Sequence, residues 1–439
     1  MTNLIVTGGA PLEGEVELCG AKNSGFKLMI AALYSDKPCQ IKNFSKIGDI
    51  ASTAKIIEEL GGKVNSTSEH ILEVSGKNIS KQNFSTENGK LSRASTYFVG
   101  PLLFRQGKAI IPNPGGCKIG NRPLDRHLEG LKALGADVEI QENQFVIQGK
   151  LKGGRYKFPK NTHGGTDVLI IAASSASGTT ILENAAEEPE IDDLIEFLNK
   201  MGAKIVREKG RIIKIEGVKE FHPAVHEVMP DRNEAVTFGC AALATKGDIY
   251  VTRANPRVLG AFLDAVSKIG GKYETDSKGI RFYYQKPLKP SNIVTRPYPG
   301  FMTDWMSLWV VLMTQAEGKS IVHETIFENR FVFVGELRKM GAKIELFNPK
   351  VPNPDEIYNF NLEDDRPEYF HAAKIFGPTK LRGSNLEITD VRAGASLILA
   401  ALSAEGENLL TGVEHLDRGY ENLDGRLKRL GAKIERKEE

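Results

Sequence analysis

The sequence is poor in cysteine, and its cysteines form no pattern that holds a metal ion or a disulfide framework. There are four in 439 residues, at positions 19, 39, 117 and 240. None belongs to a Cys-x-x-Cys pair, the spacing that is typical of zinc sites and redox motifs. The sequence therefore predicts neither a metal site nor a network of disulfides.

Long hydrophobic runs and a strong net charge are missing as well. The longest apolar runs, such as 168–173 and 308–313, are far shorter than the ~20 residues of a membrane-spanning helix. The first residues lack the hydrophobic core of a signal peptide, and the formal net charge is only +2, spread along the chain. We therefore expect a cytoplasmic globular protein that has no membrane or nucleic-acid partner.

The chain does contain a repeat. Six times, an amphipathic helical pattern ends in a hydrophobic residue and a glycine, followed by Gly or Ala and a short β-prone run. A glycine just past the end of a helix adopts a positive φ at little steric cost, so it caps the helix and turns the chain. Successive glycines are 74, 67, 68, 71 and 90 residues apart, at Gly61, Gly135, Gly202, Gly270, Gly341 and Gly431.

Repeats of this length predict a small set of α/β subdomains. Units of about 70 residues are longer than those of an open solenoid, so each can build a subdomain. Six units suggest two domains of three, because a single core rarely exceeds about 250 to 300 residues. The last interval is the longest, and we place its extra residues in an insertion near 345–380. This insertion is either a solvated loop, or a flap or oligomer contact.

Cys117 lies among three glycines and three basic residues in the stretch 114–127. Glycines free the backbone to bend around the thiol, and cationic neighbours lower a thiol pKa from about 8.5 by one to several units. The stretch therefore indicates a thiol that acts as an acid or a nucleophile near neutral pH. From these residues alone, a small buried structural cysteine stays an equally good alternative.

The same stretch resembles a known active-site loop. Its pattern P-G-G-C-x-I-G-x-R-P-x-D-x-H is similar to that of the UDP-N-acetylglucosamine 1-carboxyvinyltransferases, a family of enolpyruvyl transferases that opens peptidoglycan precursor synthesis. The stretches G-A-K-N at 20–23 and E-T-x-F-E-N-R-F at 324–331 match further motifs of this family. The resemblance covers the chain except roughly 345–380.

This resemblance implies a fold. Members of the family are two-domain, inside-out α/β barrels, with three repeats around buried helices in each domain and the active site in the interdomain cleft. The chain crosses twice between the domains, which corresponds here to positions near 21–22 and 230–231. We therefore expect one domain at 22–230, which holds the Cys117 loop, and a second at 1–21 plus 231–439.

The resemblance also implies an activity. The family transfers the enolpyruvyl group of phosphoenolpyruvate to the 3′-hydroxyl of UDP-N-acetylglucosamine by addition and elimination, and releases phosphate. These steps require a base, an acid and strong anion binding, but no metal or organic cofactor. We expect Asp304 to be the base, Cys117 the acid at C3 of phosphoenolpyruvate, and Lys22 to take part in catalysis. Four basic residues would hold phosphoenolpyruvate: Lys22, Arg122, Arg392 and Arg418.

The second substrate, UDP-N-acetylglucosamine, is expected to contact residues from several motifs. Arg330 would contact anionic substrate groups when the domains close. His163 replaces a small apolar residue of the family pattern at the position expected to contact the uridine. Asp49 is expected to cap a helix rather than to contact substrate. The expected nucleotide-sugar contacts are Asn23, Arg93, Arg122, Pro123, Leu124, Asp125, Arg126, His127, Lys160, Thr162, His163, Gly164, Asp304, Ile326 and Phe327.

Two alternative functions stay open from the sequence. An enolpyruvyl transferase of the shikimate type shares the fold and the phosphoenolpyruvate site, but its loop lacks a cysteine at this position. A non-catalytic paralogue that binds UDP-sugars and regulates the pathway would bind the nucleotide sugar without turnover. The sequence also leaves open whether the chain forms a homo-oligomer.

Overall fold

The computed structural model describes residues 2–115 and 119–438, which form two compact units. The first unit comprises residues 2–19, 119–122 and 230–438, and the second comprises residues 20–115 and 123–229. Residues 119–122 thus belong to the first unit, although the chain on either side of this stretch belongs to the second.

Helices and strands alternate along both units. The first unit contains β1 (Thr2–Thr7), β2 (Glu13–Glu17), α8 (Arg232–Ala244), β14 (Asp248–Thr252), η3 (Pro256–Val258), α9 (Gly260–Lys268), β15 (Lys272–Thr275), β16 (Gly279–Tyr283), β17 (Asn292–Val294), α10 (Thr303–Thr314), β18 (Gly318–His323), α11 (Val334–Lys339), β19 (Lys343–Phe347), α12 (Pro354–Ile357), η4 (Leu362–Asp364), β20 (Ala372–Gly377), β21 (Asn385–Glu387), α13 (Val391–Ser403), β22 (Glu407–Thr411), α14 (Val413–Asp417), α15 (Leu423–Arg429) and β23 (Lys433–Glu438). The second unit contains α1 (Lys22–Ala31), η1 (Ala32–Tyr34), β3 (Cys39–Lys42), α2 (Gly48–Glu59), β4 (Lys63–Ser68), β5 (Ile71–Ser75), α3 (Thr86–Leu91), η2 (Arg93–Phe98), α4 (Val99–Gln106), β6 (Lys108–Pro112), α5 (Asp125–Ala133), β7 (Asp137–Ile140), β8 (Gln144–Gln148), β9 (Gly154–Lys157), α6 (His163–Ala173), β10 (Thr179–Glu183), α7 (Pro189–Lys200), β11 (Lys204–Glu208), β12 (Ile212–Glu216) and β13 (Val225–Glu227).

The described residues of each unit form three sheets, and five of these six sheets share one strand pattern. In the sheet β17-β18-β20-β19, the first two strands are parallel and the remaining pairs are antiparallel. The same pattern recurs in β15-β16-β14-β2 (read from β2), β21-β22-β1-β23, β13-β3-β5-β4 and β11-β12-β10-β9 (read from β9). In the three-stranded sheet β6-β8-β7, a single parallel bridge from Asn83 to Ile110 takes the place of the fourth strand. The six sequence repeats are therefore six copies of one α/β subdomain.

The six repeat glycines have the backbone conformation predicted from the sequence. Their φ angles lie between +80° and +102°. At Gly61, between α2 and β4, an added Cβ atom would lie 2.5 Å from the carbonyl oxygen of Asn78. Glycine is thus required there both for its left-handed conformation and for the close approach of another backbone segment.

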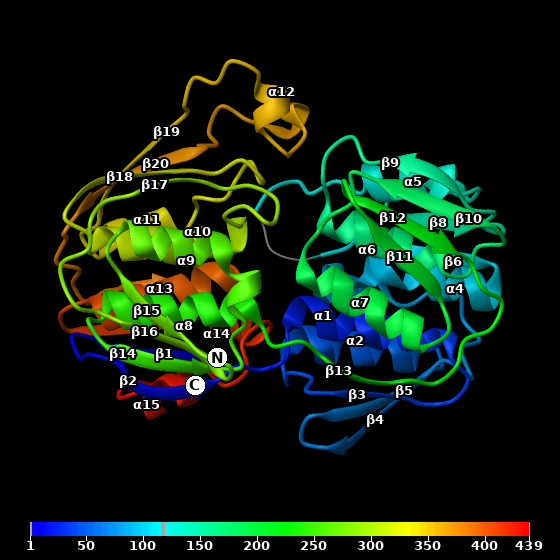
Figure 1. Cartoon of the computed structure of the whole chain (residues 1–439), viewed down its shortest axis with the longest axis horizontal. Coiled ribbons are helices and arrows are strands. Elements are labelled where there is room, and N and C mark those ends of the chain that lie inside the picture. The colour runs from blue at the N-terminus through cyan, green and yellow to red at the C-terminus, as the bar shows by residue number, and fades with distance from the viewer. Residues whose placement is uncertain (1, 116–118, 439) are drawn as a thin grey trace. The chain divides into compact units, whose positions relative to one another are not determined.

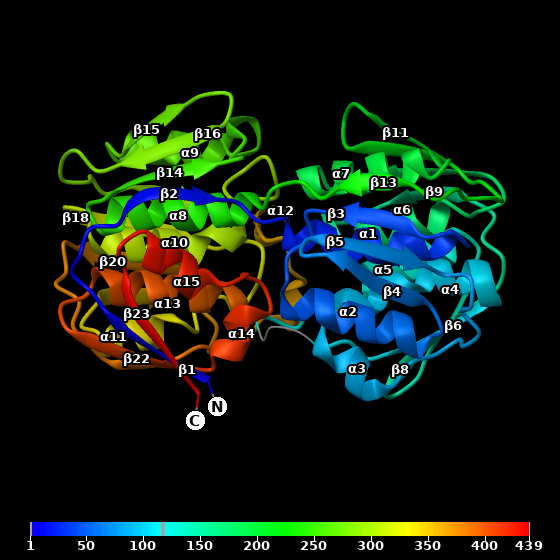
Figure 2. The same ribbon diagram turned by 90° about the horizontal axis from the view of Figure 1, so that it is seen from below.

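Buried helices form the centre of the first unit. In α8, α10 and α13 nearly every residue is buried, and Figures 1 and 2 show these helices in the middle of the unit with its sheets around them. The fully buried Trp305 and Trp309 of α10 meet the rings of Phe262 and Phe301 edge to face. In the second unit, α1 and α6 are buried in the same way.

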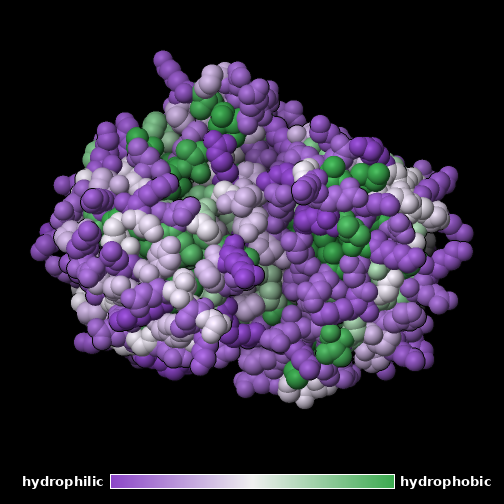
Figure 3. Space-filling model, viewed as in Figure 1, coloured by the Kyte–Doolittle hydropathy of each residue, from purple (hydrophilic) through white to green (hydrophobic). Residues whose placement is uncertain are grey.

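The first and last strands of the chain lie together, because β1 pairs antiparallel with β23 (Figure 1). On the face of the molecule in Figure 3, hydrophilic residues predominate and the hydrophobic residues form small separate groups. Among the helices of the described residues, none is long and apolar enough to cross a membrane.

Candidate active site

Lys22 begins α1 of the second unit and is held by an ion pair. Its Nζ atom lies 2.9 Å from Oδ2 of Asp49 and 5.9 Å from the ring centre of Phe26. The prediction that Asp49 caps a helix is wrong: Ile47 occupies the N-cap of α2, and Asp49 lies in the first turn with its side chain almost fully buried. Asp49 therefore orients Lys22, and the half-buried Asn23 follows in the same helical turn.

Arg93 also stands at the beginning of a buried helical stretch in the second unit. It opens η2, where the hydroxyl of Ser92 accepts a hydrogen bond from the backbone N–H of Ala94 at 3.2 Å. The buried run continues directly into α4. The N-terminal end of a helix carries partial positive charge and unpaired N–H groups, so this position suits an anion.

A buried ion pair lies beside these residues. Lys27 of α1 donates to both carboxylate oxygens of Asp167 in α6 at 3.0 and 2.9 Å, and both side chains are fully buried. Burial raises the pKa of Asp167 to about 7, although Lys27 acts to lower it. His163 completes the cluster, with Nε2 3.2 Å from Nζ of Lys27 and 3.3 Å from Oδ2 of Asp167. The residue that departs from the family pattern thus contacts an internal ion pair.

The predicted uridine segment forms the beginning of α6. The hydroxyl of Thr162 caps this helix by accepting the N–H of Gly165 at 3.2 Å, and the half-buried Lys160 lies two residues before the cap. Gly164 packs closely against the first turn of α5, because a Cβ atom there would lie 3.3 Å from Nε2 of His127. The structure therefore brings together residues from two of the predicted contact segments.

The segment 123–127 leads into α5. Pro123 is exposed, Leu124 occupies the N-cap and is buried, and Asp125 is the first helical residue. Arg126 and His127 follow in the first turn and are half-buried. An aspartate in the first turn stabilises the helix through its interaction with the helix dipole.

In the first unit, the predicted base contacts a predicted phosphoenolpyruvate ligand. Oδ2 of Asp304, in the first turn of α10, lies 3.3 Å from Nε and 3.3 Å from Nη2 of Arg392, in the first turn of α13. Nη1 of Arg392 donates to the hydroxyl of Tyr420 at 3.1 Å. This hydroxyl also lies 2.9 Å from Oγ1 of Thr237 in α8. Burial alone would lower the pKa of Arg392, but Tyr420 and Asp304 raise it overall. Arg392 therefore stays charged although it is almost fully buried.

The stretch 324–331 is organised by a buried carboxylate. Glu324 accepts hydrogen bonds from the hydroxyl of Thr303 at 2.9 Å and from the N–H groups of Ile326 and Phe327 at 2.7 and 3.1 Å. Burial raises the pKa of Glu324, and these hydrogen bonds act against that shift. The turn that carries Ile326 and Phe327 is thereby fixed to the first turn of α10. Arg330 is almost fully buried, with Nη1 3.5 Å from Oδ1 of Asp390.

The remaining predicted arginines also lie in the first unit. The guanidinium of Arg122 lies over the ring of Phe327, 5.6 Å from its centre. Arg418 is half-buried at the C-terminal end of α14. Asp231 caps α8 by accepting the N–H of Asn233 at 2.7 Å, and Arg232 is buried beside aromatic rings rather than solvated.

Cys117 lies outside the residues that the structure describes. The predicted proton donor of the reaction is therefore placed only by its sequence, between the described residues 115 and 119.

Several site neighbours were missed by the sequence analysis. Asp390 caps α13 through the N–H groups of Arg392 and Ala393, and Tyr420 contacts the Arg392 guanidinium. Both lie in motifs in which only the arginines were predicted to have a role. Lys27 and Asp167 left a different signal: each borders an apolar run of its helix, where a charge is rare unless it is paired.

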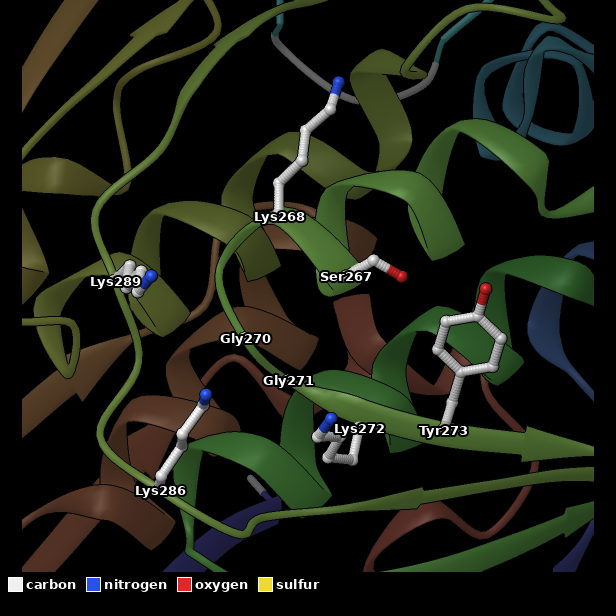
Figure 4. Close-up of a pocket in the computed structure, with 8 residues that line it drawn as sticks. All are labelled: Ser267, Lys268, Gly270, Gly271, Lys272, Tyr273, Lys286 and Lys289. Carbon is white, nitrogen blue, oxygen red and sulfur yellow. The ribbon is translucent and has the colours of Figure 1, made fainter.

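A cavity elsewhere in the first unit does not include the predicted residues. It has a volume of about 460 Å³ and lies at the C-terminal end of α9, where Figure 4 shows lysine side chains around the turn at Gly270 and Gly271. Its lining is Ser267, Lys268, Gly270, Gly271, Lys272, Tyr273, Lys286 and Lys289. Lysines at a helix C-terminus stabilise the helix through its dipole, which accounts for their position here. We therefore place the candidate active site not at this cavity but at the helix N-termini that carry predicted residues.

Five of the predicted residues share one structural position, the beginning of a buried helix. Lys22, Arg93 and His163 stand at the beginnings of the buried α1, η2 and α6, and Asp304 and Arg392 stand at those of α10 and α13. Helix N-termini present positive charge and N–H donors, so these positions suit anions. The model of the EPSP synthase (3-phosphoshikimate 1-carboxyvinyltransferase) family matches residues 6–427.

The chain belongs to the EPSP synthase family. Curated relatives in this family include the UDP-N-acetylglucosamine 1-carboxyvinyltransferase of Trichlorobacter lovleyi, which is 40% identical over 438 residues and covers 99% of both chains. The enzyme of that name from Koribacter versatilis is 39% identical over 440 residues, which is 99% of this chain and 96% of the relative. The predicted family is thus confirmed.

Solved structures of the family show the same fold. The enolpyruvyl transferase NikO from Streptomyces tendae superimposes with a TM-score of 0.86 over 99% of both chains, at 22% identity. An EPSP synthase from Acinetobacter baumannii gives a TM-score of 0.74 over 100% of both chains, at 17% identity. At these identities the comparison concerns the fold alone, and it confirms the predicted two-domain α/β architecture.

Proposed function

We propose that this chain transfers the enolpyruvyl group of phosphoenolpyruvate to the 3′-hydroxyl of UDP-N-acetylglucosamine, releases phosphate, and so opens peptidoglycan precursor synthesis. Full-length relatives that carry the name of this activity support the proposal. One structural observation carries it: the carboxylate of Asp304 and the guanidinium of Arg392 meet at the N-terminal ends of two buried helices.

Each step of this reaction has a candidate group. Asp304 takes the proton of the sugar hydroxyl as its oxygen adds to C2 of phosphoenolpyruvate, and Cys117 gives a proton to C3. Loss of phosphate from C2 and of a proton from C3 then leaves the enolpyruvyl ether. The phosphate and carboxylate of phosphoenolpyruvate are held by four basic residues: Lys22, Arg122, Arg392 and Arg418. Their fixed positive charge stabilises the transition state.

The other cysteines support the assignment of the acid to Cys117. Cys19 is half-buried, and Cys39 and Cys240 are buried. Burial raises the thiol pKa of all three, and Glu234 adds to the effect at Cys19. A thiol that stays protonated near pH 7 and is shielded from solvent is a poor acid or nucleophile for a bound substrate. Cys117 is the remaining cysteine, and it stands among basic residues in the sequence.

Chemical modification tests this assignment. An epoxide phosphonate of the fosfomycin type should inactivate the protein by alkylating Cys117. The variant Cys117→Asp should resist the reagent and keep activity, because a carboxylic acid can still donate a proton. Cys19→Ser is the matched control and should remain as sensitive as the unchanged protein. Continued inactivation of Cys117→Asp, or its resistance without activity, would count against the role of Cys117 as the acid.

Acceptor dependence of phosphate release tests the proposed function as a whole. With phosphoenolpyruvate present, phosphate should appear when UDP-N-acetylglucosamine is added and not when shikimate 3-phosphate is added. The reverse preference would identify a transferase of the shikimate type. Binding of the nucleotide sugar without phosphate release would indicate a non-catalytic paralogue.

A further inference from the structure

The insertion in the last interval between repeat glycines replaces a short hairpin turn. In the repeats of the second unit, and at β15–β16, the corresponding antiparallel strands are joined by only two or three residues. Between β19 and β20 the chain instead runs through the 24 residues 348–371. We call this segment the β19–β20 arm. Figure 1 shows it standing off the ends of β19 and β20, with α12 at its tip.

An aromatic cluster fixes the base of the arm. The ring of Tyr358 stacks on that of Phe360 with centres 4.9 Å apart, and both contact the ring of His371 at 5.0 and 5.1 Å. All three residues are almost fully buried. The N–H of Asn359 donates to the carbonyl oxygen of Thr325 at 2.7 Å. Such packing is atypical of a solvated loop and ties the arm to the start of the stretch 324–331.

The arm then reaches the chain that follows Cys117. In η4, Oδ1 of Asp364 accepts a hydrogen bond from the side-chain amide of Asn121 at 2.6 Å. The backbone N–H of Asn121 donates to the carboxylate of Glu328, and the N–H of Asn329 donates to the carbonyl oxygen of Ile119 at 3.3 Å. Residues 119–122 are therefore held between the stretch 324–331 on one side and Asp364 on the other.

Two backbone features show how closely residues 119–122 pack against the stretch 324–331. A Cβ atom on Gly120 would lie 2.4 Å from Oε2 of Glu328, so any larger residue there would displace that carboxylate. Arg122 has a φ of +51°, a left-handed conformation that non-glycine residues adopt only when their surroundings favour it. In this conformation its guanidinium lies over the ring of Phe327.

We propose that Asp364 of the β19–β20 arm is a positioning residue: by holding Asn121 it fixes residues 119–122 and with them the direction of Arg122. The inference deepens the proposed function, since Arg122 is there a ligand of phosphoenolpyruvate and the nucleotide sugar. Asp364 acts through Asn121 and contacts no substrate itself.

Hydrogen exchange tests the anchor without any turnover. In Asp364→Ala, exchange of the side-chain amide protons of Asn121 should be about five-fold faster than in the unchanged protein, because their surface hydrogen bond to a charged acceptor is lost. Asp364→Asn should stay within about two-fold, since its amide oxygen still accepts the hydrogen bond. Glu363→Ala, the neighbouring exposed residue of η4, is the matched control and should change nothing. Equal exchange in Asp364→Ala and the unchanged protein, or equal acceleration in Glu363→Ala, would overturn the proposal.

Steady-state kinetics test the link to Arg122. Asp364→Ala should raise the KM for phosphoenolpyruvate about five-fold while kcat stays within about two-fold, because a less well oriented ligand weakens binding more than chemistry. Asn121→Ala should match it, and the double variant should add no further loss. An accelerated exchange with an unchanged KM would overturn the link to Arg122. If the unchanged protein shows no turnover, the proposed function fails, while the exchange measurement still decides whether Asp364 is an anchor.

Discussion

Replacing Asp304 by asparagine is expected to lower kcat about 10³-fold, because removal of a positioned general base typically costs 10²- to 10⁴-fold in rate. Asparagine keeps the size of the side chain and one oxygen that can accept from Arg392, so the fold and the ion-pair geometry should be disturbed little. The KM for UDP-N-acetylglucosamine should change only a few-fold, since the proton transfer belongs to the chemical step. The measurement is phosphate release at saturating concentrations of both substrates.

Asp264→Asn is the matched control for this variant. Asp264 lies in α9 of the same unit, is exposed, and belongs to none of the predicted contacts. The Asp264→Asn variant should have an unchanged kcat, and its melting temperature should equal that of the Asp304→Asn variant. If Asp304→Asn kept more than a tenth of the original kcat, the base would have to be another group.

The largest expected loss of stability follows replacement of Lys27 by methionine. Breaking a buried ion pair leaves an uncompensated buried charge and typically costs about 3 to 5 kcal/mol. Lys27 and Asp167 are fully buried and joined by two hydrogen bonds, so this range applies to unfolding of the second unit. Urea titration followed by far-ultraviolet circular dichroism measures the loss.

The loss in Lys27→Met should also depend on pH. Burial raises the pKa of Asp167 to about 7 even with Lys27 present, and removal of Lys27 raises it further. A carboxyl group that binds its proton more tightly in the folded state loses stability as the pH rises toward its folded pKa. The difference between Lys27→Met and the unchanged protein should therefore grow above pH 7, by up to about 1.4 kcal/mol per pH unit.

Two variants separate this mechanism from simple loss of packing. Lys27→Met combined with Asp167→Asn should recover much of the stability and lose the pH dependence, because no buried charge remains. Lys46→Met removes one partner of an exposed pair with Glu69 and should cost less than about 1 kcal/mol. A pH-independent loss in Lys27→Met would mean that Asp167 is not responsible.

The fold could be predicted far more fully than the surroundings of the site. The six capping glycines are a local signal, since a helix end and a turn depend on a few adjacent residues, and all six have the predicted conformation. Family membership followed from motifs that are contiguous in the sequence. The length of the last interval located the insertion, and the structure places it at the turn between β19 and β20.

The contacts that orient the site could not be predicted, because they join residues far apart in the sequence. The sequence neighbours of Asp49 indicate a capping residue, but its carboxylate contacts Lys22 because α1 packs against α2. In the sequence, Asp364 is one of several acidic residues of a predicted insertion, and only the folding of the β19–β20 arm brings it into contact with Asn121. The roles assigned to Cys117 and to the substrate-binding residues stay predictions.

The activity is tested most directly by identifying the product. Incubation with phosphoenolpyruvate and UDP-N-acetylglucosamine should give one phosphate for each molecule of nucleotide sugar consumed, and nuclear magnetic resonance should place an enolpyruvyl ether at the 3′-oxygen. Recovery of both substrates unchanged from a correctly folded sample, or transfer to another acceptor in preference, would contradict the proposed reaction.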